Sequence, residues 1–184
     1  MTNIILASAS PRRKKILEDA GLSFDIIPSQ YDEKLENNIF SKEKIENIAF
    51  QKANEVAQKH PHAIIISADT VVVFNNKLFT KPKDKNEAFA MLETLSGETH
   101  FVQTSVCVIK DGIPHIISTI TNVTFNNLTK DMINKYIDEF KPFDKAGAYG
   151  IQELPDGFIK NIDGDLENVI GISSSVVINI LNTI

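Results

Sequence analysis

The run Ala63-Ile64-Ile65-Ile66-Ser67-Ala68 is the most apolar stretch of the sequence, and it decides the fold class. A continuous apolar run of this length predicts a strand that is buried on both faces, as in a sheet covered by helices. Asp69-Thr70 interrupts the run, and Val71-Val72-Val73-Phe74 is strand-like again before a turn at Asn75-Asn76. We therefore expect a central strand that stops at Asp69.

Segments on both sides of this strand alternate between strand and helix patterns. A short strand over residues 3–7 leads into a helix from Pro11 to about Ala20, with Ser10 as its N-cap. Asp111-Gly112 predicts a hairpin between two long strands. Further helices are expected over residues 41–59, 84–95, 129–139 and 174–181, and further strands over residues 24–27, 99–109, 114–125 and 145–152. This order predicts an α/β fold with a mixed, twisted sheet flanked by helices.

Composition narrows the class of protein. The chain has 184 residues, 42% of them hydrophobic, and a formal net charge of −5, which suits one domain spanning residues 1–184. A net negative chain is a poor binder of nucleic acid polymers, because such binding depends on neutralising many phosphates. No stretch approaches the ~20 apolar residues of a membrane span. The only cysteine, Cys107, can form no intrachain disulfide, so we expect a reducing, cytoplasmic location without a membrane partner.

The chain contains only two arginines, Arg12 and Arg13, and they are adjacent. A guanidinium group binds phosphate or carboxylate through two parallel hydrogen bonds, which an ammonium group cannot do. The pair therefore indicates a position where this geometry matters. The alternative is two solvated side chains on the first turn of a helix.

The segment before these arginines, Ser8-Ala9-Ser10-Pro11, is suited to an anion. Backbone N–H groups at a helix start point into the preceding loop, and the helix dipole favours negative charge there. Two cations in the first turn are unfavourable for the helix itself, so their presence indicates an anionic ligand. Ser8 and Ser10 would add two hydroxyl groups to this site. The Gly-rich P-loop pattern is absent from the chain, which argues against P-loop ATP hydrolysis.

Asp69 is a second candidate, because a carboxylate at a strand end, backed by apolar core, can act as a base or a ligand. The alternative is a residue that caps a turn. Lys52, Lys81 and Glu33 are ambiguous by themselves, since charged residues are solvated by default. The four histidines show no metal-site spacing with the single cysteine, so a structural zinc site is not supported.

The segment from Ala146 to Gln152, Ala-Gly-Ala-Tyr-Gly-Ile-Gln, is a third candidate. Its two glycines allow a ligand to approach the backbone closely. Gln152 can donate and accept hydrogen bonds, as recognition of a nucleobase requires. The alternative is a bulged strand without a ligand.

Taken in order along the chain, these motifs resemble those of the Maf family, the septum-formation-inhibitor-like nucleotide pyrophosphatases. The form Gly-Ala-Tyr-Gly-Ile-Gln is similar to the branch that acts on dTTP and UTP, and not to the branch that acts on 7-methyl-GTP. The resemblance implies two lobes around a central cleft, similar to inosine triphosphate pyrophosphatases. Departures from the family pattern are Asn47, Ser173 and the segment 153–156, where a small, Gly-containing continuation is usual. The matching segments are Ser8–Arg13, Ser67–Val72, Lys81-Pro82, Leu95-Ser96-Gly97 with His100, Asp144–Gln152 and Asn168–Gly171.

The resemblance also implies roles for single residues. Asp69 would be the proton acceptor and would face a divalent metal, Mg²⁺ or Mn²⁺, together with Glu33. The specificity positions would be Arg12, Thr70 and Gln152. The phosphate contacts, including the hydroxyls inferred above, would be Ser8, Ser10, Arg12, Arg13, Lys52 and Lys81.

The sequence therefore predicts a nucleoside triphosphate pyrophosphatase that hydrolyses dTTP and UTP, or modified pyrimidine nucleotides, to the monophosphate and pyrophosphate. The alternatives are a pyrophosphatase that prefers 7-methyl-GTP and a non-catalytic nucleotide-binding regulator of cell division. A sensor needs cations but no base, and an unneeded carboxylate at Asp69 would repel phosphate, which favours the enzyme. The resemblance also suggests a homodimer.

Overall fold

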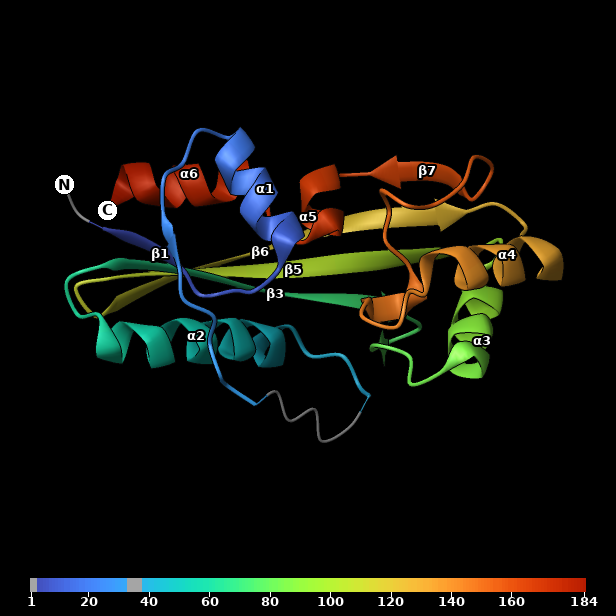
Figure 1. The fold of residues 1–184 in the computed structure, drawn as a ribbon, viewed down its shortest axis with the longest axis horizontal. Coiled ribbons are helices and arrows are strands. Elements are labelled where there is room, and N and C mark those ends of the chain that lie inside the picture. Colours follow the sequence, from blue (N-terminus) through green and yellow to red (C-terminus); the bar gives the residue numbers. More distant parts are fainter. Residues whose placement is uncertain (1–2, 33–37) are drawn as a thin grey trace.

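In the described part of the chain, one mixed sheet of seven strands has helices on both of its faces (Figure 1). The computed structural model describes residues 3–32 and 38–184, so Glu33 lies outside the described residues. The strand order is β2-β1-β3-β5-β6-β7, and β4 pairs with β3. β1 is parallel to β2 and β3, whereas the other pairs are antiparallel. The strands are β1 (Ile4–Leu6), β2 (Asp25–Ile26), β3 (Ile64–Phe74), β4 (Lys77–Phe79), β5 (Thr99–Lys110), β6 (Ile113–Phe125) and β7 (Ile159–Asp163).

The helices begin where side chains cap them. Ser10, Ser41, Asp84 and Thr129 each accept a hydrogen bond from a backbone N–H three residues further on, which confirms four predicted helix starts. No helix in the described part of the chain is long and apolar enough to cross a membrane. The helices are α1 (Pro11–Asp19), α2 (Lys42–Lys59), α3 (Lys85–Leu95), α4 (Lys130–Phe140), α5 (Leu166–Ile170) and α6 (Ser174–Thr183).

The expectation that the central strand stops at Asp69 is wrong. β3 continues unbroken through Asp69 and Thr70, because β5 pairs with it from Ile65 to Val73. Hydrogen bonds to β5 hold the polar pair in extended backbone, which the sequence of β3 alone does not reveal. Since side chains alternate across a strand, Asp69 and Thr70 point to opposite faces of the sheet.

The other edge of β3 contains a gap. β1 pairs with residues 64–66 and β4 pairs with residues 72–74, and between them no described strand pairs with β3 on that edge. Asp69 and Thr70 lie inside this gap. A ligand can therefore approach the strand from its side and meet groups from both faces of the sheet.

The predicted strand over residues 145–152 is also wrong. The segment forms a 3-10 turn, Ala146–Ala148, followed by irregular turns. Gly147 and Ala148 have φ of 69° and 61°, in the left-handed region, which a strand does not use. The strands β4 and β7 and the short helix α5 were not predicted.

The core is divided between the two ends of the long strands. At one end, α3 and α4 enclose aromatic side chains that include Phe125, Tyr136 and Phe158. At the other end, α1 and α6 pack on one face of the sheet and α2 packs on the other. The expected mixed α/β sheet flanked by helices is thus confirmed, and the gap on β3 lies between the two ends.

Candidate active site

A cleft opens at the gap on β3 and receives side chains from segments that are far apart in the sequence. It contains nearly all of the residues that the sequence singled out, apart from Ser8, which borders an adjoining hollow, and Glu33, which lies outside the described residues. The predicted residues that line the cleft are Ser10, Arg12, Arg13, Lys52, Asp69, Thr70, Lys81 and Gln152.

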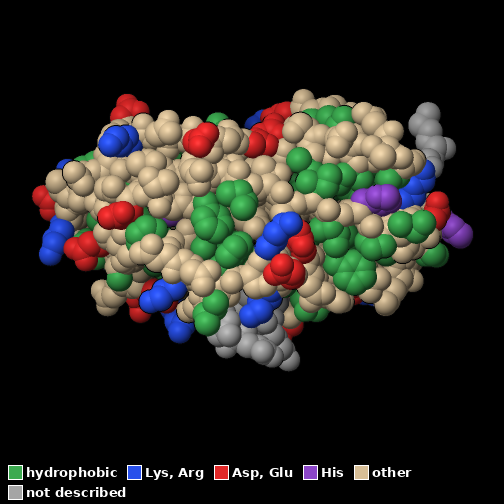
Figure 2. Space-filling model, turned by 180° about the vertical axis from the view of Figure 1, so that it is seen from behind, with side chains coloured by type: hydrophobic (Ala, Val, Ile, Leu, Met, Phe, Trp, Pro, Cys, Tyr) green, Lys and Arg blue, Asp and Glu red, His purple; other side chains and the backbone are tan. Residues whose placement is uncertain are grey.

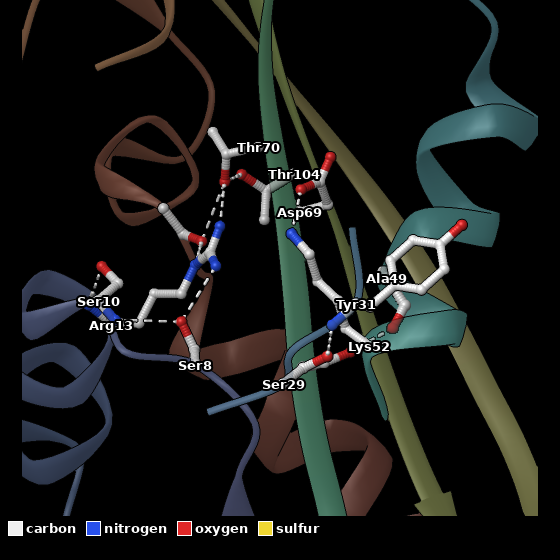
Figure 3. A network of polar contacts seen from close by, with 12 residues as sticks. Ser8, Ser10, Arg13, Ser29, Tyr31, Ala49, Lys52, Asp69, Thr70 and Thr104 are labelled. Atoms are coloured by element: carbon white, nitrogen blue, oxygen red, sulfur yellow. Dashed lines mark hydrogen bonds and ion pairs between the residues drawn. The ribbon is translucent and has the colours of Figure 1, made fainter. Parts of the chain in front are cut away.

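On one face of the sheet, α2 supplies a cation to Asp69. Lys52 Nζ donates to Asp69 Oδ1 at 2.7 Å, and both side chains are largely buried (Figure 3). Ser67 Oγ donates to the carbonyl of Ala49 and so ties α2 to β3 beside this pair. Loss of one partner would leave an unpaired buried charge, so Lys52 fixes the position of the carboxylate.

On the other face, Arg13 joins α1 to the sheet. Its Nε donates to the carbonyl of Gly171 at 2.9 Å, and its terminal nitrogens donate to Ser8 Oγ at 3.2 Å and to Thr70 Oγ1 at 3.1 Å. Figure 3 shows this fork on the side of β3 opposite Lys52. The guanidinium group of Arg13, which we expected to bind phosphate, thus forms hydrogen bonds to other residues of the protein.

The hydroxyl of Thr70 is held by several partners. Besides receiving the Arg13 contact, it shares a hydrogen bond with Thr104 Oγ1 at 2.9 Å and lies 3.1 Å from the carbonyl of Gly171. The side chain of Asn168, fully buried, binds the backbone N–H of Thr104 at 3.0 Å. Thr70 therefore belongs to a rigid network that shapes the cleft wall.

Arg12 and Lys81 present their cations to the cleft. Arg12 Nη1 lies 3.7 Å from Asp144 Oδ2, and Lys81 is exposed. The N-terminus of α1 opens beside them, capped by the Ser10 hydroxyl. Helix N–H groups and cations together form a site for an anion with several negative charges.

Three charged residues of the cleft were not given a role from the sequence. Lys145 Nζ lies 2.9 Å from Asp144 Oδ1 and 3.2 Å from Glu153 Oε2, and Lys145 is buried. Although burial raises the pKa of Asp144, hydrogen bonding to Lys145 and the charges of Lys145 and Arg12 hold it below its usual value. The adjacent charges of Asp144 and Lys145 were a signal, but no local pattern indicates the contact with Glu153.

The loop that carries Gln152 is anchored by aromatic side chains. Tyr149 OH shares a hydrogen bond of 2.7 Å with His100 Nε2, and Tyr136 OH accepts from the backbone N–H of Gly150 at 3.1 Å. Burial lowers the pKa of His100 to about 4 and raises that of Tyr136 to about 12, so both groups are neutral at pH 7. These anchors leave the exposed side chain of Gln152 beside the cleft.

A metal ion could bind here through oxygen. The described residues contain no group of three or more His, Cys, Asp or Glu side chains placed to hold a metal. Mg²⁺ does not require such a group, because it is usually bound by one or two carboxylates, water and substrate phosphates. The Asp69 carboxylate is a donor of this type, so the site fits a metal that arrives with a phosphorylated ligand.

Comparison with known proteins gives consistent matches over the whole chain. The sequence profile of the family described as Maf-like protein matches residues 3–184. The dTTP/UTP pyrophosphatase of Bacillus pumilus is 43% identical over 183 residues, covering 100% of this chain and 97% of that protein. The protein of the same name from Geobacillus sp. is 43% identical, covering 95% and 94%. In fold, the chain is similar to a HAM1 protein from Coxiella burnetii, with a TM-score of 0.54, 14% identity and 100% coverage of both chains.

Proposed function

The chain belongs to the Maf family, and from this premise we propose that it is a nucleoside triphosphate pyrophosphatase acting on dTTP and UTP. It cleaves between the α and β phosphates and releases the nucleoside monophosphate and pyrophosphate. The observation that carries this proposal is the cleft on β3, which gathers Arg12, Lys52 and Lys81 beside Asp69 in a protein of net charge −5. An acidic protein can hold a triphosphate only where it concentrates cations locally.

The phosphate chain binds between α1 and α2 in this proposal. Arg12, Lys81 and the N-terminus of α1 take its oxygens, with Ser8 and Ser10 beside them. Arg13 acts chiefly through the wall that it holds together, since its three donor nitrogens already bind Gly171, Ser8 and Thr70. The cations also stabilise the negative charge that develops on the departing pyrophosphate.

Asp69 acts as the proton acceptor. A water molecule gives its proton to the carboxylate while its oxygen forms a bond to the α phosphorus. The bond from this phosphorus to the bridging oxygen breaks, and its electron pair leaves with pyrophosphate. Lys52 orients Asp69 through the 2.7 Å contact, so the base is in position before the substrate arrives.

Mg²⁺ or Mn²⁺ is proposed as the cofactor, held by Asp69 together with Glu33. When bound, such an ion neutralises phosphate charge and so assists attack at phosphorus. The remaining contributions are those of the chain itself, which binds the phosphates and places Asp69.

Gln152, Thr70 and Arg12 are proposed to select the base. The amide of Gln152 can pair with both a carbonyl and the ring N–H of uracil or thymine. A site that forms hydrogen bonds to one edge of a nucleobase rejects bases that leave its polar groups unpaired. Gln152→Glu removes the amide donor and should reduce the preference for UTP more than it slows cleavage.

The decisive test is a panel of nucleoside triphosphates incubated with the protein and Mg²⁺ or Mn²⁺. We expect pyrophosphate as the first product and much faster hydrolysis of dTTP and UTP than of CTP, ATP or GTP. Orthophosphate as the first product would contradict the cleavage position. A highest kcat/KM on 7-methyl-GTP would favour the alternative substrate, and binding without hydrolysis would favour the regulator.

A cytoplasmic homodimer is proposed as the form in which the enzyme acts. β7 pairs only with residues 122–125 of β6, and the earlier part of β6 carries Ile113 and Ile120, which are 61% and 51% exposed. Hydrophobic side chains also reach the surface at several places on the face shown in Figure 2. Residues 113–121 contain no Asp, Glu, Lys or Arg, so two antiparallel copies can meet without like charges.

Light scattering tests the dimer. Ile120→Lys should give a monomer, whereas Leu166→Lys, at another exposed apolar position, should leave the mass unchanged. A monomeric wild-type protein would contradict the proposal.

A further inference from the structure

Lys145 is a buried cation in the cleft whose partners are both acidic and more exposed than itself. Its side chain is 9% exposed, whereas those of Asp144 and Glu153 are 64% and 35% exposed. All three line the same cleft as Arg12 and Gln152. A buried ammonium group requires an anion close by, because an unpaired charge is costly away from water.

The side chains of Lys145 and Glu153 meet in the space that a side chain at Gly150 would occupy. A Cβ built on Gly150 would lie 2.9 Å from Lys145 Cε and 3.1 Å from Glu153 Oε2. A side chain at position 150 would therefore push the pair apart. Residues 150–153 form a turn, in which the Glu153 N–H donates to the Gly150 carbonyl at 2.9 Å. This turn brings Glu153 back towards Gly150.

The difference in exposure decides which partner can move. Asp144 is mostly exposed, so its carboxylate can rotate into water at small cost. Glu153 Oε2 is buried and has no hydrogen-bond partner in the described part of the chain, so rotation into water would let this oxygen be hydrated. The side chain of Lys145 is surrounded by protein atoms, so its ammonium group stays at the cleft. An anion entering the cleft can therefore replace a carboxylate on Lys145, while the ammonium group stays in place.

We propose that Lys145 is a further substrate-binding cation, which takes a phosphate oxygen of the nucleotide, and that Glu153 is a placeholder anion displaced by the substrate. This rests on the proposed function. The position of Asp144 between Lys145 and Arg12 favours the phosphate chain as the ligand, because both cations then face one anionic group.

Two substitutions have opposite expected effects on affinity. Lys145→Met removes a charge-assisted hydrogen bond and should weaken binding of a triphosphate by roughly 10- to 100-fold. Glu153→Gln keeps the shape but removes the competing charge, and it should tighten binding by roughly 3- to 10-fold. A purely structural role for the ion pair would weaken binding in both variants.

Calorimetric titration measures these effects without turnover. The probes are α,β-methylene-UTP, in which the bond to be cleaved is replaced, and inorganic tripolyphosphate, which has no base. Both probes should respond to both substitutions in the stated directions at constant ionic strength. The matched controls are Lys160→Met and Asp156→Asn, which change exposed charges outside the ion pair and should leave both affinities unchanged.

The outcomes separate this inference from the proposed function. If wild type hydrolyses UTP but Glu153→Gln binds both probes no more tightly, the placeholder is wrong and the function stands. If Lys145→Met affects only the nucleotide probe, Lys145 contacts the base and the inference is overturned. A wild type that neither binds nor hydrolyses UTP overturns both. Should Lys145→Met fail to fold, Glu153→Gln decides alone.

Discussion

The two walls of the cleft, the N-terminus of α1 and the loop of residues 144–153, hold their charged groups by different means. The first wall is organised by neighbouring residues, since Ser10 caps the helix through the N–H of Arg13. The second is held by distant residues, chiefly His100 and Tyr136. A wall built by local contacts can be predicted from sequence, whereas a wall built by distant contacts forms only when the sheet and α4 are in place.

Asp69 lies between the walls, and its substitution should have the largest effect. Asp69→Asn keeps the size and a hydrogen bond from Lys52 but cannot accept a proton, so turnover of UTP should fall by ~10²-fold or more. Steady-state kinetics with UTP measure this. Asp163→Asn, on β7 away from the cleft, is the control. Near-normal turnover of Asp69→Asn would remove Asp69 from catalysis.

Acidification should lower the free energy of unfolding through protonation of His100, which anchors the second wall. Its pKa is about 4 in the folded protein and near 6.5 in the unfolded chain, so the unfolded chain binds more protons between these values. Stability therefore falls as the pH drops from 6.5 towards 4, by up to about 3 kcal/mol from this residue.

Urea unfolding at several pH values checks this effect. His100→Gln cannot be protonated, so its free energy of unfolding should fall less steeply with acid than that of wild type. His115→Gln, at a more exposed histidine on β6, should follow the wild-type curve. Parallel curves for wild type and His100→Gln would exclude His100 as the cause.

Lysine substitutions at the two arginines sharpen the description of the first wall. Arg13→Lys cannot serve three acceptors, so it should lower the free energy of unfolding by roughly 1.5–3 kcal/mol and also reduce activity. Arg12→Lys should leave stability nearly unchanged and raise KM, because Arg12 faces the cleft. Thermal unfolding and kinetics separate the two effects. Equal stability losses would show that both arginines are structural.

The smallest expected effect is a difference in stability between alanine substitutions at two glycines. Gly21, after α1, and Gly147, in the second wall, have φ of 81° and 69°, so alanine is strained at either. Only Gly147 is crowded, because a Cβ there would lie 3.0 Å from Val72. Gly147→Ala should therefore destabilise the protein by ~1 kcal/mol more than Gly21→Ala in urea unfolding. Equal losses would mean that the loop moves away from β3 without cost.

The sequence by itself determined the elements whose signals are local. Helix starts such as Ser10 and Asp84 depend on a side chain and an N–H three residues apart, and the hairpin at Asp111-Gly112 depends on two positive φ angles. Residue chemistry also singled out Arg12, Arg13 and Asp69 in the cleft, whereas Lys52 and Lys81 were indicated only by the family resemblance. Their roles stay predictions until the variants above are measured.

Only the tertiary structure decided the features that depend on distant partners. β3 passes through Asp69 because β5 pairs with it, and the gap on its other edge arises from where β1 and β4 end. The ion pair between Lys145 and Glu153 forms because the turn at Gly150 is anchored to Tyr136. Hydrogen bonds and ion pairs between residues far apart leave no periodic pattern in the chain, so they emerge only when the sheet brings their partners together.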